Sequence, residues 1–343
     1  MHRGKLKTRI GGMTFVILSL SWTTCLGLGW AQDERQSLLR FPMAHPSTAW
    51  QHLPRTNPPL PEWALVLVET LPKTTGSMLE LDFLHRAENP LGAVWSGKLR
   101  WVVADALGCE YGRQYALADL RQAGLREEDL SSLRSRSVAD ESAEQMILEL
   151  ARRLTLEADA VGDEELASLQ TLLNAEQVVA LVHTVAFANF QNRIFLGLGV
   201  ELSQPDPVPA QRYDFDRAAR AEVATPPRPS WESLRNSIGS GSPLQSANWT
   251  ERTIDELESA LASQQARQPR IPMPDEQRLA ALPPEILQRS GKIVWSRLSM
   301  GYQPRLTMAW FECMRTFQSE ARLDRVFSNS FFWVITRANN CFY

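Results

Sequence analysis

Residues 63–111 read WALVLVETLPKTTGSMLELDFLHRAENPLGAVWSGKLRWVVADALGCEY, and residues 295–343 read WSRLSMGYQPRLTMAWFECMRTFQSEARLDRVFSNSFFWVITRANNCFY. The two stretches align without a gap and are identical at 13 of 49 positions. The identical pairs include Trp63 and Trp295, Glu80 and Glu312, Glu88 and Glu320, Trp101 and Trp333, and Cys109 and Cys341. A repeat this long indicates a duplicated domain rather than a solenoid of short units. We predict a first repeat at residues 60–203 and the N-terminal half of a second repeat at residues 276–343.

Helical periodicity runs through the whole first repeat. Residues 75–87 carry a broad apolar face, and Asn174 is placed to cap a long apolar helix over residues 175–196. Gly108 separates two helices, and Gly124 stands where a glycine ends a helix. Further helices are expected at residues 63–71, 97–107, 109–124, 125–133, 140–155 and 163–173. Because no stretch alternates with period two, the sequence predicts an all-α protein.

The overall charge argues against a nucleic-acid partner. The chain has 343 residues, a formal net charge of -3 and a pI near 6.0. Its basic residues are scattered and form no long run. Its 11 tryptophans and 44% hydrophobic residues are typical of a packed globular protein.

The N-terminus has the organisation of a signal peptide. Residues 2–9 are basic, residues 13–31 carry no charge, and Gly29 and Ala31 are the small residues that a signal peptidase requires. We therefore expect residues 1–31 to be removed and the mature chain to be exported, either periplasmic or secreted. The alternative is a membrane anchor at residues 13–31, because this run approaches the roughly 20 residues that span a bilayer.

Two segments outside the repeats have the composition of connecting chain. Residues 32–59 are polar and Pro-rich and are expected to form an extended lead-in. Residues 204–275 contain ten of the 21 prolines and a Gly-Ser-Gly-Ser stretch, which is typical of a linker. Within it, Thr253 and Glu256 are spaced as a capping box, so a short helix is expected there.

After removal of the signal peptide, three cysteines remain, namely Cys109, Cys313 and Cys341. Three cysteines are too few to form a disulfide framework in a chain of this size. Cys313 aligns with Leu81 and is expected to be an ordinary core residue. Cys109 and Cys341 occupy the same position of the two repeats.

Four short motifs resemble the carboxymuconolactone decarboxylase/alkylhydroperoxidase (AhpD-like) family. They are Leu-Gly-Cys-Glu-Tyr at 107–111, Leu-Arg-Gln-Ala-Gly-Leu at 120–125, Asn-Phe-Gln-Asn-Arg-Ile at 189–194 and Arg-Ala-Asn-Asn-Cys-Phe-Tyr at 337–343. The resemblance implies a small all-helical bundle and a thiol-dependent (peroxiredoxin-type) hydroperoxide reductase. Its partners would be a hydroperoxide and a thiol reductant, it would need neither cofactor nor metal, and it would form homo-oligomers through helical faces.

Peroxidases of that family carry Cys-x-x-Cys with a histidine four residues after the second cysteine. Two cysteines in one helical turn can form and break a disulfide, and the helix N-terminus favours a thiolate. Here Cys109 matches the first cysteine, but Gly112 and Ala116 replace the other two residues. We therefore expect the first repeat to be catalytically inactive, with Cys109 a degenerate remnant or simply a small residue at a helix junction. Cys341 is the candidate catalytic cysteine of the second repeat, although its partner would directly follow Tyr343.

The remaining polar candidates have a structural interpretation beside each functional one. His183 lies in an apolar helix and is expected to be a satisfied core histidine rather than a base. Glu80 and Glu312 are expected to share a structural role rather than to relay protons. Three polar side chains of the long helix, Asn189, Asn192 and Arg193, are expected to bridge helices, the alternative being that they line a pocket.

Two hypotheses of function follow. The first is an exported, tandem thiol-dependent peroxidase whose second repeat carries the redox cysteines. The second is a non-enzymatic helical interaction or oligomerisation protein, which the departures at Gly112 and Ala116 favour. Lactone decarboxylation is a third possibility for this fold, but no acid-base pocket for it can be placed in the sequence.

Overall fold

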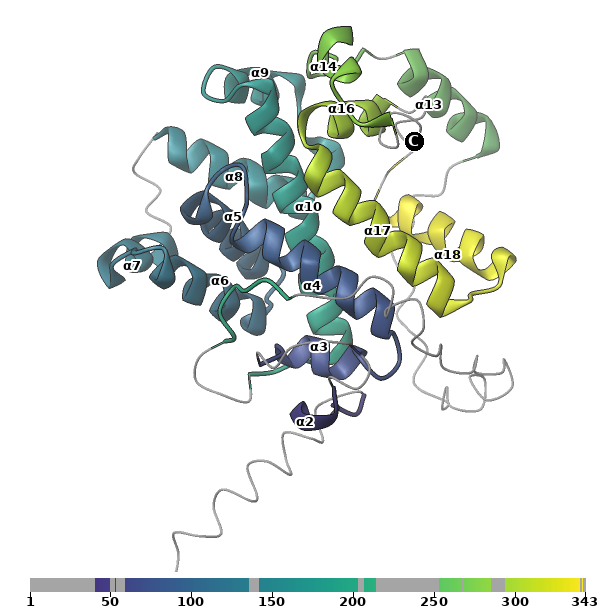
Figure 1. Cartoon of the computed structure of the whole chain (residues 1–343). Helices are drawn as coiled ribbons and strands as arrows, with labels where there is room; N and C mark the ends of the chain where they lie inside the picture. Colours follow the sequence, from purple (N-terminus) through teal and green to yellow (C-terminus); the bar gives the residue numbers. More distant parts are fainter. Residues whose placement is uncertain are drawn as a thin grey trace, which may run out of the picture.

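The computed structural model describes residues 41–49, 53, 59–135, 142–202, 207–213, 253–266, 268–284, 294–339 and 341. These residues form fourteen α-helices and one short 3₁₀-helix, with no strand among them (Figure 1). The prediction of an all-α fold is confirmed. The predicted signal peptide at residues 1–31 lies outside the described residues. None of the helices in the described ranges combines the length and apolar character needed to cross a bilayer.

The first repeat contains most of the helices. They are α3 (Glu62–Leu67), α4 (Pro72–Arg86), α5 (Ala93–Ala106), α6 (Glu110–Gln122), α7 (Glu127–Ser135), α8 (Ala143–Leu156), η1 (Ala158–Ala160), α9 (Asp163–Gln170) and α10 (Ala175–Leu198). Asn174 caps α10 as predicted, with its side chain accepting from the Gln177 amide at 2.9 Å. The helix ends at Gly199, which adopts a left-handed conformation with φ of 70°.

Several helix boundaries differ from their predictions; α5, for example, begins at Ala93 rather than at residue 97. The helix expected over residues 63–71 would end just before Pro72, but α3 ends at Leu67 and Pro72 is the first residue of α4. Proline suits this position because the first helical residue has no intrahelical partner for its N–H group. The helix expected at residues 75–87 therefore begins three residues earlier.

The second repeat is represented by α14 (Glu276–Ala280), α16 (Val294–Tyr302), α17 (Pro304–Ala321) and α18 (Arg325–Ala338). Ahead of it, α13 (Ile254–Ala266) begins at the predicted capping box, in which the Glu256 carboxylate accepts from the Thr253 amide at 2.7 Å. The sequence pairs α4 with α17 and α5 with α18. That the two repeats arose by duplication stays a prediction from the sequence.

The connecting segments are less extended than expected. The lead-in contains α2 (Pro46–Ala49), and Ala49 is fully buried. The segment at residues 207–213 packs on the first repeat, where the Tyr213 hydroxyl donates to the Pro59 carbonyl at 2.9 Å. At the other end of the linker, Arg270 forms an ion pair with Asp163 at 2.6 Å. Both ends of the predicted linker are therefore packed against the helical domain, while residues 214–252 lie outside the described residues.

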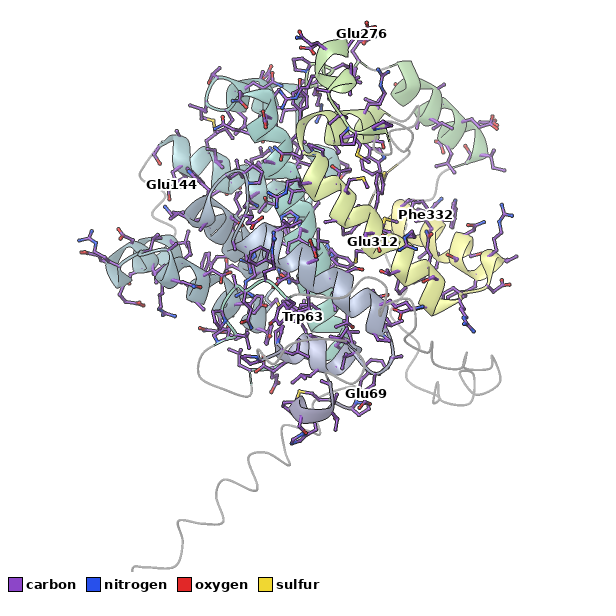
Figure 2. The ribbon with its side chains drawn as sticks, in the orientation of Figure 1. Trp63, Glu69, Glu144, Glu276, Glu312 and Phe332 are labelled. Atoms are coloured by element: carbon purple, nitrogen blue, oxygen red, sulfur yellow. The ribbon has the colours of Figure 1, made fainter. Side chains whose placement is uncertain are left out.

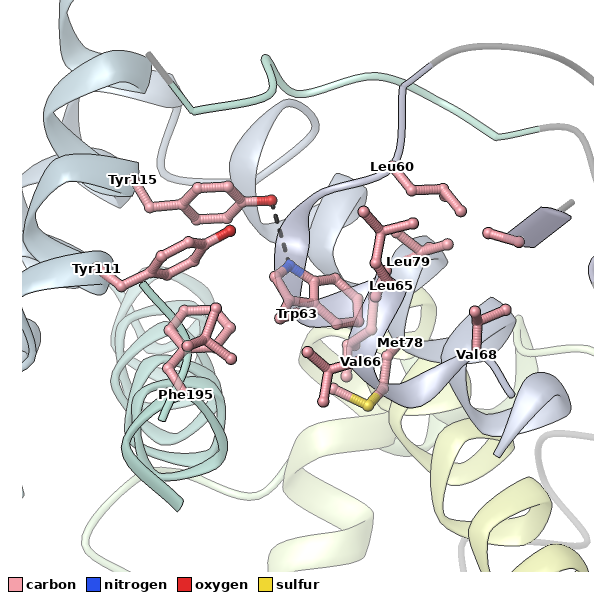
Figure 3. Close-up of a cluster of buried hydrophobic side chains, with 14 of the residues drawn as sticks. Leu60, Trp63, Leu65, Val66, Val68, Met78, Leu79, Tyr111, Tyr115 and Phe195 are labelled. Carbon is pink, nitrogen blue, oxygen red and sulfur yellow. Dashed lines mark hydrogen bonds between the residues drawn. The ribbon is translucent and has the colours of Figure 1, made fainter. Parts of the chain in front are cut away.

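The core of the first repeat is built around Trp63 (Figure 3). Trp63 is fully buried, and its indole N–H donates to the Tyr115 hydroxyl at 3.5 Å. The rings of Tyr111, Tyr115 and Phe195 lie on one side of Trp63, with Tyr111 meeting Phe195 edge to face at 4.7 Å. This aromatic cluster holds α3, α6 and α10 together.

The helices α4 and α17 pack against each other in antiparallel orientation (Figure 1). Near the end of α17, the Glu320 carboxylate accepts hydrogen bonds from the Lys73 amide, the Thr74 amide and the Thr74 hydroxyl, each at 2.7 Å. Just after α4, Glu88 forms an ion pair with Arg305 in the first turn of α17. Glu88 and Glu320 occupy the same position of the two repeats. Glu88 of the first repeat lies at the start of α17, and Glu320 of the second repeat lies at the start of α4, where a carboxylate is favourable.

Candidate functional site

The predicted thiol site of the first repeat is closed by packing. Cys109 precedes the first residue of α6 but is only 1% exposed. Burial raises the pKa of the Cys109 thiol, and this effect exceeds the opposing influence of the Gly112 amide and Arg113. At neutral pH the group is a buried, protonated thiol, which is a poor nucleophile.

The position of the missing second cysteine is filled by another side chain. A Cβ atom at Gly112 would lie 1.7 Å from the Asn192 Oδ1 atom. Asn192 is buried and is fixed by a 2.7 Å hydrogen bond from its Nδ2 to the Ala188 carbonyl. Ala116, at the histidine position, is fully buried in the core. A dithiol motif would therefore need repacking between α6 and α10.

The other two cysteines have opposite environments. Cys313 is buried, and burial raises its pKa to about 12, which agrees with the core role expected for it. Cys341 is exposed. All three described cysteines are free thiols, so no disulfide exists among them.

The polar side chains of α10 behave differently from one another. Asn189 donates to the Thr155 hydroxyl at 3.0 Å and so bridges α10 to α8 as expected. Asn192 donates to the Ala188 carbonyl of its own helix, and its side chain lies close to Gly112 of α6. Arg193 is exposed. The amide side chains therefore support the packing of α10.

The structural role expected for both Glu80 and Glu312 stays a prediction, because the ion pair of Glu312 has no counterpart at Glu80. Glu312 forms an ion pair with Arg315 at 2.7 Å on its own helix. The residue that corresponds to Arg315 in the first repeat is Phe83, so Glu80 lacks this contact. The reciprocal pair is instead Glu88 and Glu320.

A buried ionic network that the sequence analysis missed joins α4, α5 and α6. Arg86 binds Asp119 through two hydrogen bonds of 2.8 Å and Asp82 through one of 3.0 Å. Arg100 also binds Asp119, at 2.5 Å. Burial alone would raise the pKa of Asp119, but the two arginines hold it below its usual value. Both carboxylates are paired with arginine, so we interpret the network as structural.

A cavity of about 290 Å³ lies between the two repeats. Its walls come from α4 and α10 on one side and from α16, α17 and Ile271 on the other. Its aromatic and histidine lining consists of His85, His183, Phe187, Trp295 and Trp310. None of its lining residues is an acid, a lysine or an arginine. The cavity therefore combines an apolar, ring-lined wall with two imidazoles.

The two imidazoles are neutral and have unused hydrogen-bonding capacity. His85 stacks on Phe187 with ring centroids 4.2 Å apart, and burial, together with the nearby His183 and Arg100, keeps its pKa well below the usual value. Burial lowers the pKa of His183 to about 4. The Nδ1 atom of His85 and the Nε2 atom of His183 are buried without a hydrogen-bond partner. His183 is thus not the satisfied core histidine that was expected, and His85 was not anticipated at all.

No family model, curated protein or solved structure matches this chain. Within the described ranges, no cluster of histidine, cysteine, aspartate and glutamate could hold a metal ion. The interpretation of the site therefore depends on its own geometry and on the motifs in the sequence.

Proposed function

We propose that this chain is an exported, tandem member of the carboxymuconolactone decarboxylase/alkylhydroperoxidase family that acts as a non-enzymatic helical interaction protein. The observation that carries this proposal is the packing at Gly112. There Asn192 occupies the space that a second cysteine would need, and Cys109 is buried as a thiol. In this proposal the first repeat is a helical domain that lacks the sulfur chemistry implied by the resemblance.

The surface available for interaction is the apolar face of α18. This helix has no buried residue, and Phe332 and Trp333 are 66% and 55% exposed. Phe332 is labelled on α18 in Figure 2. In the first repeat, the corresponding helix α5 buries Trp101 and Val102 beneath its neighbours α6, α8 and α10. A large exposed aromatic face of this kind is typical of a protein interface.

The occupant that we propose for this face is a second copy of the same chain. The contact between α4 and α17 already shows two corresponding helices packing in antiparallel orientation, as they would across the twofold axis of a dimer. Pairing α18 with α18 of another chain repeats that arrangement with self-complementary aromatic surfaces. It would also explain the homo-oligomer that the resemblance implies.

Light scattering coupled to size-exclusion chromatography tests the interaction. We expect the full chain to elute as a dimer and the Phe332→Glu variant as a monomer, because a carboxylate cannot be buried in the aromatic contact. Leu261→Glu on α13 is the matched control, since Leu261 is also an exposed apolar helix residue and should leave the dimer intact. A monomeric wild type would contradict the proposal.

A second candidate function is thiol-dependent hydroperoxide reduction by the second repeat. Cys341 favours it because this cysteine is exposed whereas Cys109 and Cys313 are buried. Hydroperoxide consumption with a dithiol reductant, compared between the wild type and Cys341→Ser, separates the two functions. No consumption, or equal rates for both proteins, would exclude a catalytic Cys341, whereas a rate abolished by the substitution would favour the peroxidase.

A further inference from the structure

We propose that the boundary between the two repeats is an acid-sensitive contact, which opens when His85 of α4 and His183 of α10 take up protons. This device is independent of the cysteine motif and of the proposed dimer. Both side chains line the cavity whose opposite wall is formed by α16 and α17 of the second repeat. Movement of the second repeat away from the first therefore brings water to this side of the two rings.

Proton uptake by the two rings requires such an opening. The Nδ1 atom of His85 and the Nε2 atom of His183 are closed off from solvent and have no hydrogen-bond partner. A charged imidazole donates through both of its nitrogens, so protonation in the closed form would leave a buried N–H group of a cation without an acceptor. In the opened form water accepts these hydrogen bonds. Protonation and separation of the repeats are therefore linked.

The charges around the two rings also oppose protonation in the closed form. Arg100 on α5 acts on His85 as a positive charge, and each protonated imidazole would repel the other. No carboxylate of α4, α5, α10, α16 or α17 is among the residues that line the cavity. The carboxylates closest to His85 along the chain, Asp82 and Glu88, are already paired with arginines. The boundary thus offers a new positive charge no partner.

The sign and size of the effect follow from the two states of the imidazole. A solvated imidazole has a pKa of about 6.5. Burial lowers the pKa of His183 to about 4 in the closed form, and that of His85 is also well below its usual value. Opening therefore becomes more favourable as the pH falls below about 6.5. Between pH 7 and pH 5 its equilibrium constant should rise about 20-fold for one imidazole and up to about 500-fold for both.

The three described cysteines can report on this opening. Cys313 of α17 is 3% exposed and belongs to the apolar cluster that also contains Met78 and Leu81 of α4, so separation of the repeats uncovers it. Cys109 is 1% exposed within the first repeat and should stay covered. Cys341 is exposed and gives the reactivity of an accessible thiol at each pH.

Labelling of the full chain with a pyridyl disulfide, which reacts with thiols at acid as well as neutral pH, tests the proposal. Mass spectrometry of peptides gives the rate at each cysteine, and each rate is divided by that of Cys341. Between pH 7 and pH 5 we expect the relative rate of Cys313 to rise by up to about 500-fold, while that of Cys109 stays unchanged. The rise should fall to about 20-fold in His85→Phe or His183→Phe and vanish in the double variant.

A third histidine provides the matched control. His45 is exposed and lies outside the cavity lining, so His45→Phe should keep the full rise at Cys313. Glutamine at positions 85 and 183 supplies a second uncharged pair of side chains that separates loss of titration from altered packing. Circular dichroism checks that each variant is folded. The proposal is overturned if the relative rate of Cys313 does not change with pH, if Cys109 becomes reactive in parallel, or if a folded double variant retains the rise.

Discussion

Removal of the Glu320 carboxylate tests the contact that holds the two repeats together. This carboxylate is buried and accepts three hydrogen bonds of 2.7 Å, from two amides in the first turn of α4 and from the Thr74 hydroxyl. In Glu320→Ala the Lys73 and Thr74 amides lose their acceptor at a helix N-terminus. Hydrogen bonds to a charged group contribute about 1.5–3 kcal/mol each, and loss of a helix cap about 0.5–2 kcal/mol. Because such contributions are not additive, we expect the free energy of unfolding to fall by about 3 kcal/mol.

The corresponding residue of the first repeat provides the matched control. Glu88 pairs with Arg305 and Arg212, whose side chains are 66% and 60% exposed. Exposed ion pairs contribute at most about 1 kcal/mol, so Glu88→Ala should lower the free energy of unfolding by less than that. Urea denaturation followed by circular dichroism measures both variants. If the two variants lose the same free energy of unfolding, burial of Glu320 does not strengthen the contact between α17 and α4.

Three further predictions concern single side chains. Gly112→Ala should lower the free energy of unfolding by about 1–3 kcal/mol in urea denaturation, because the new methyl group collides with Asn192; an unchanged midpoint would contradict this. In the native protein Cys341 should react with a thiol reagent at the rate of an exposed cysteine, and Cys341→Ser should remove this fast phase while leaving the buried Cys109 and Cys313 to react only in urea. Burial lowers the pKa of His183 from 6.5 to about 4, so the folded state favours the neutral ring. The stability that results is fully present above pH 6.5 and is lost as the pH falls toward 4, because the unfolded chain then binds a proton that the folded chain does not. Between pH 7 and pH 4, the free energy of unfolding should therefore fall by up to about 3 kcal/mol more in the wild type than in His183→Phe. Urea denaturation at the two pH values measures this difference, and an identical pH dependence in the two proteins would refute the lowered pKa of His183.

Local features of the fold could be predicted from the sequence because their causes are local. The capping side chain of Asn174 and the capping box at Thr253 act within one helical turn, so the residues that form them are neighbours in the chain. The same holds for the left-handed conformations of Gly108 and Gly124, with φ of 67° and 90°. Pro72 was misplaced because proline can either follow one helix or begin the next, and the sequence does not decide between them.

The candidate site depends on contacts that no local pattern contains. Asp82 and Arg86 are four residues apart and could have been recognised as a helical pair, but Asp119 joins them from another helix. His85 and His183 come together only because α4 packs against α10 and α17 closes the other side. No sequence pattern indicates that two buried imidazole nitrogens on these helices would be left without partners. In contrast, the departures at Gly112 and Ala116 were visible in the sequence, and the structure adds the side chain that fills the gap.

The fastening of α4 to α17 differs between the two ends of the helix pair. At one end the buried Glu320 carboxylate binds the first turn of α4, whereas at the other end Glu88 meets Arg305 at the protein surface. The start of α17 is also held to α10, because the Gln303 side chain donates to the Glu176 carbonyl at 2.9 Å. Added salt therefore weakens the Glu88 contact and leaves the Glu320 contact nearly unchanged, because ions screen exposed charges far more than buried ones.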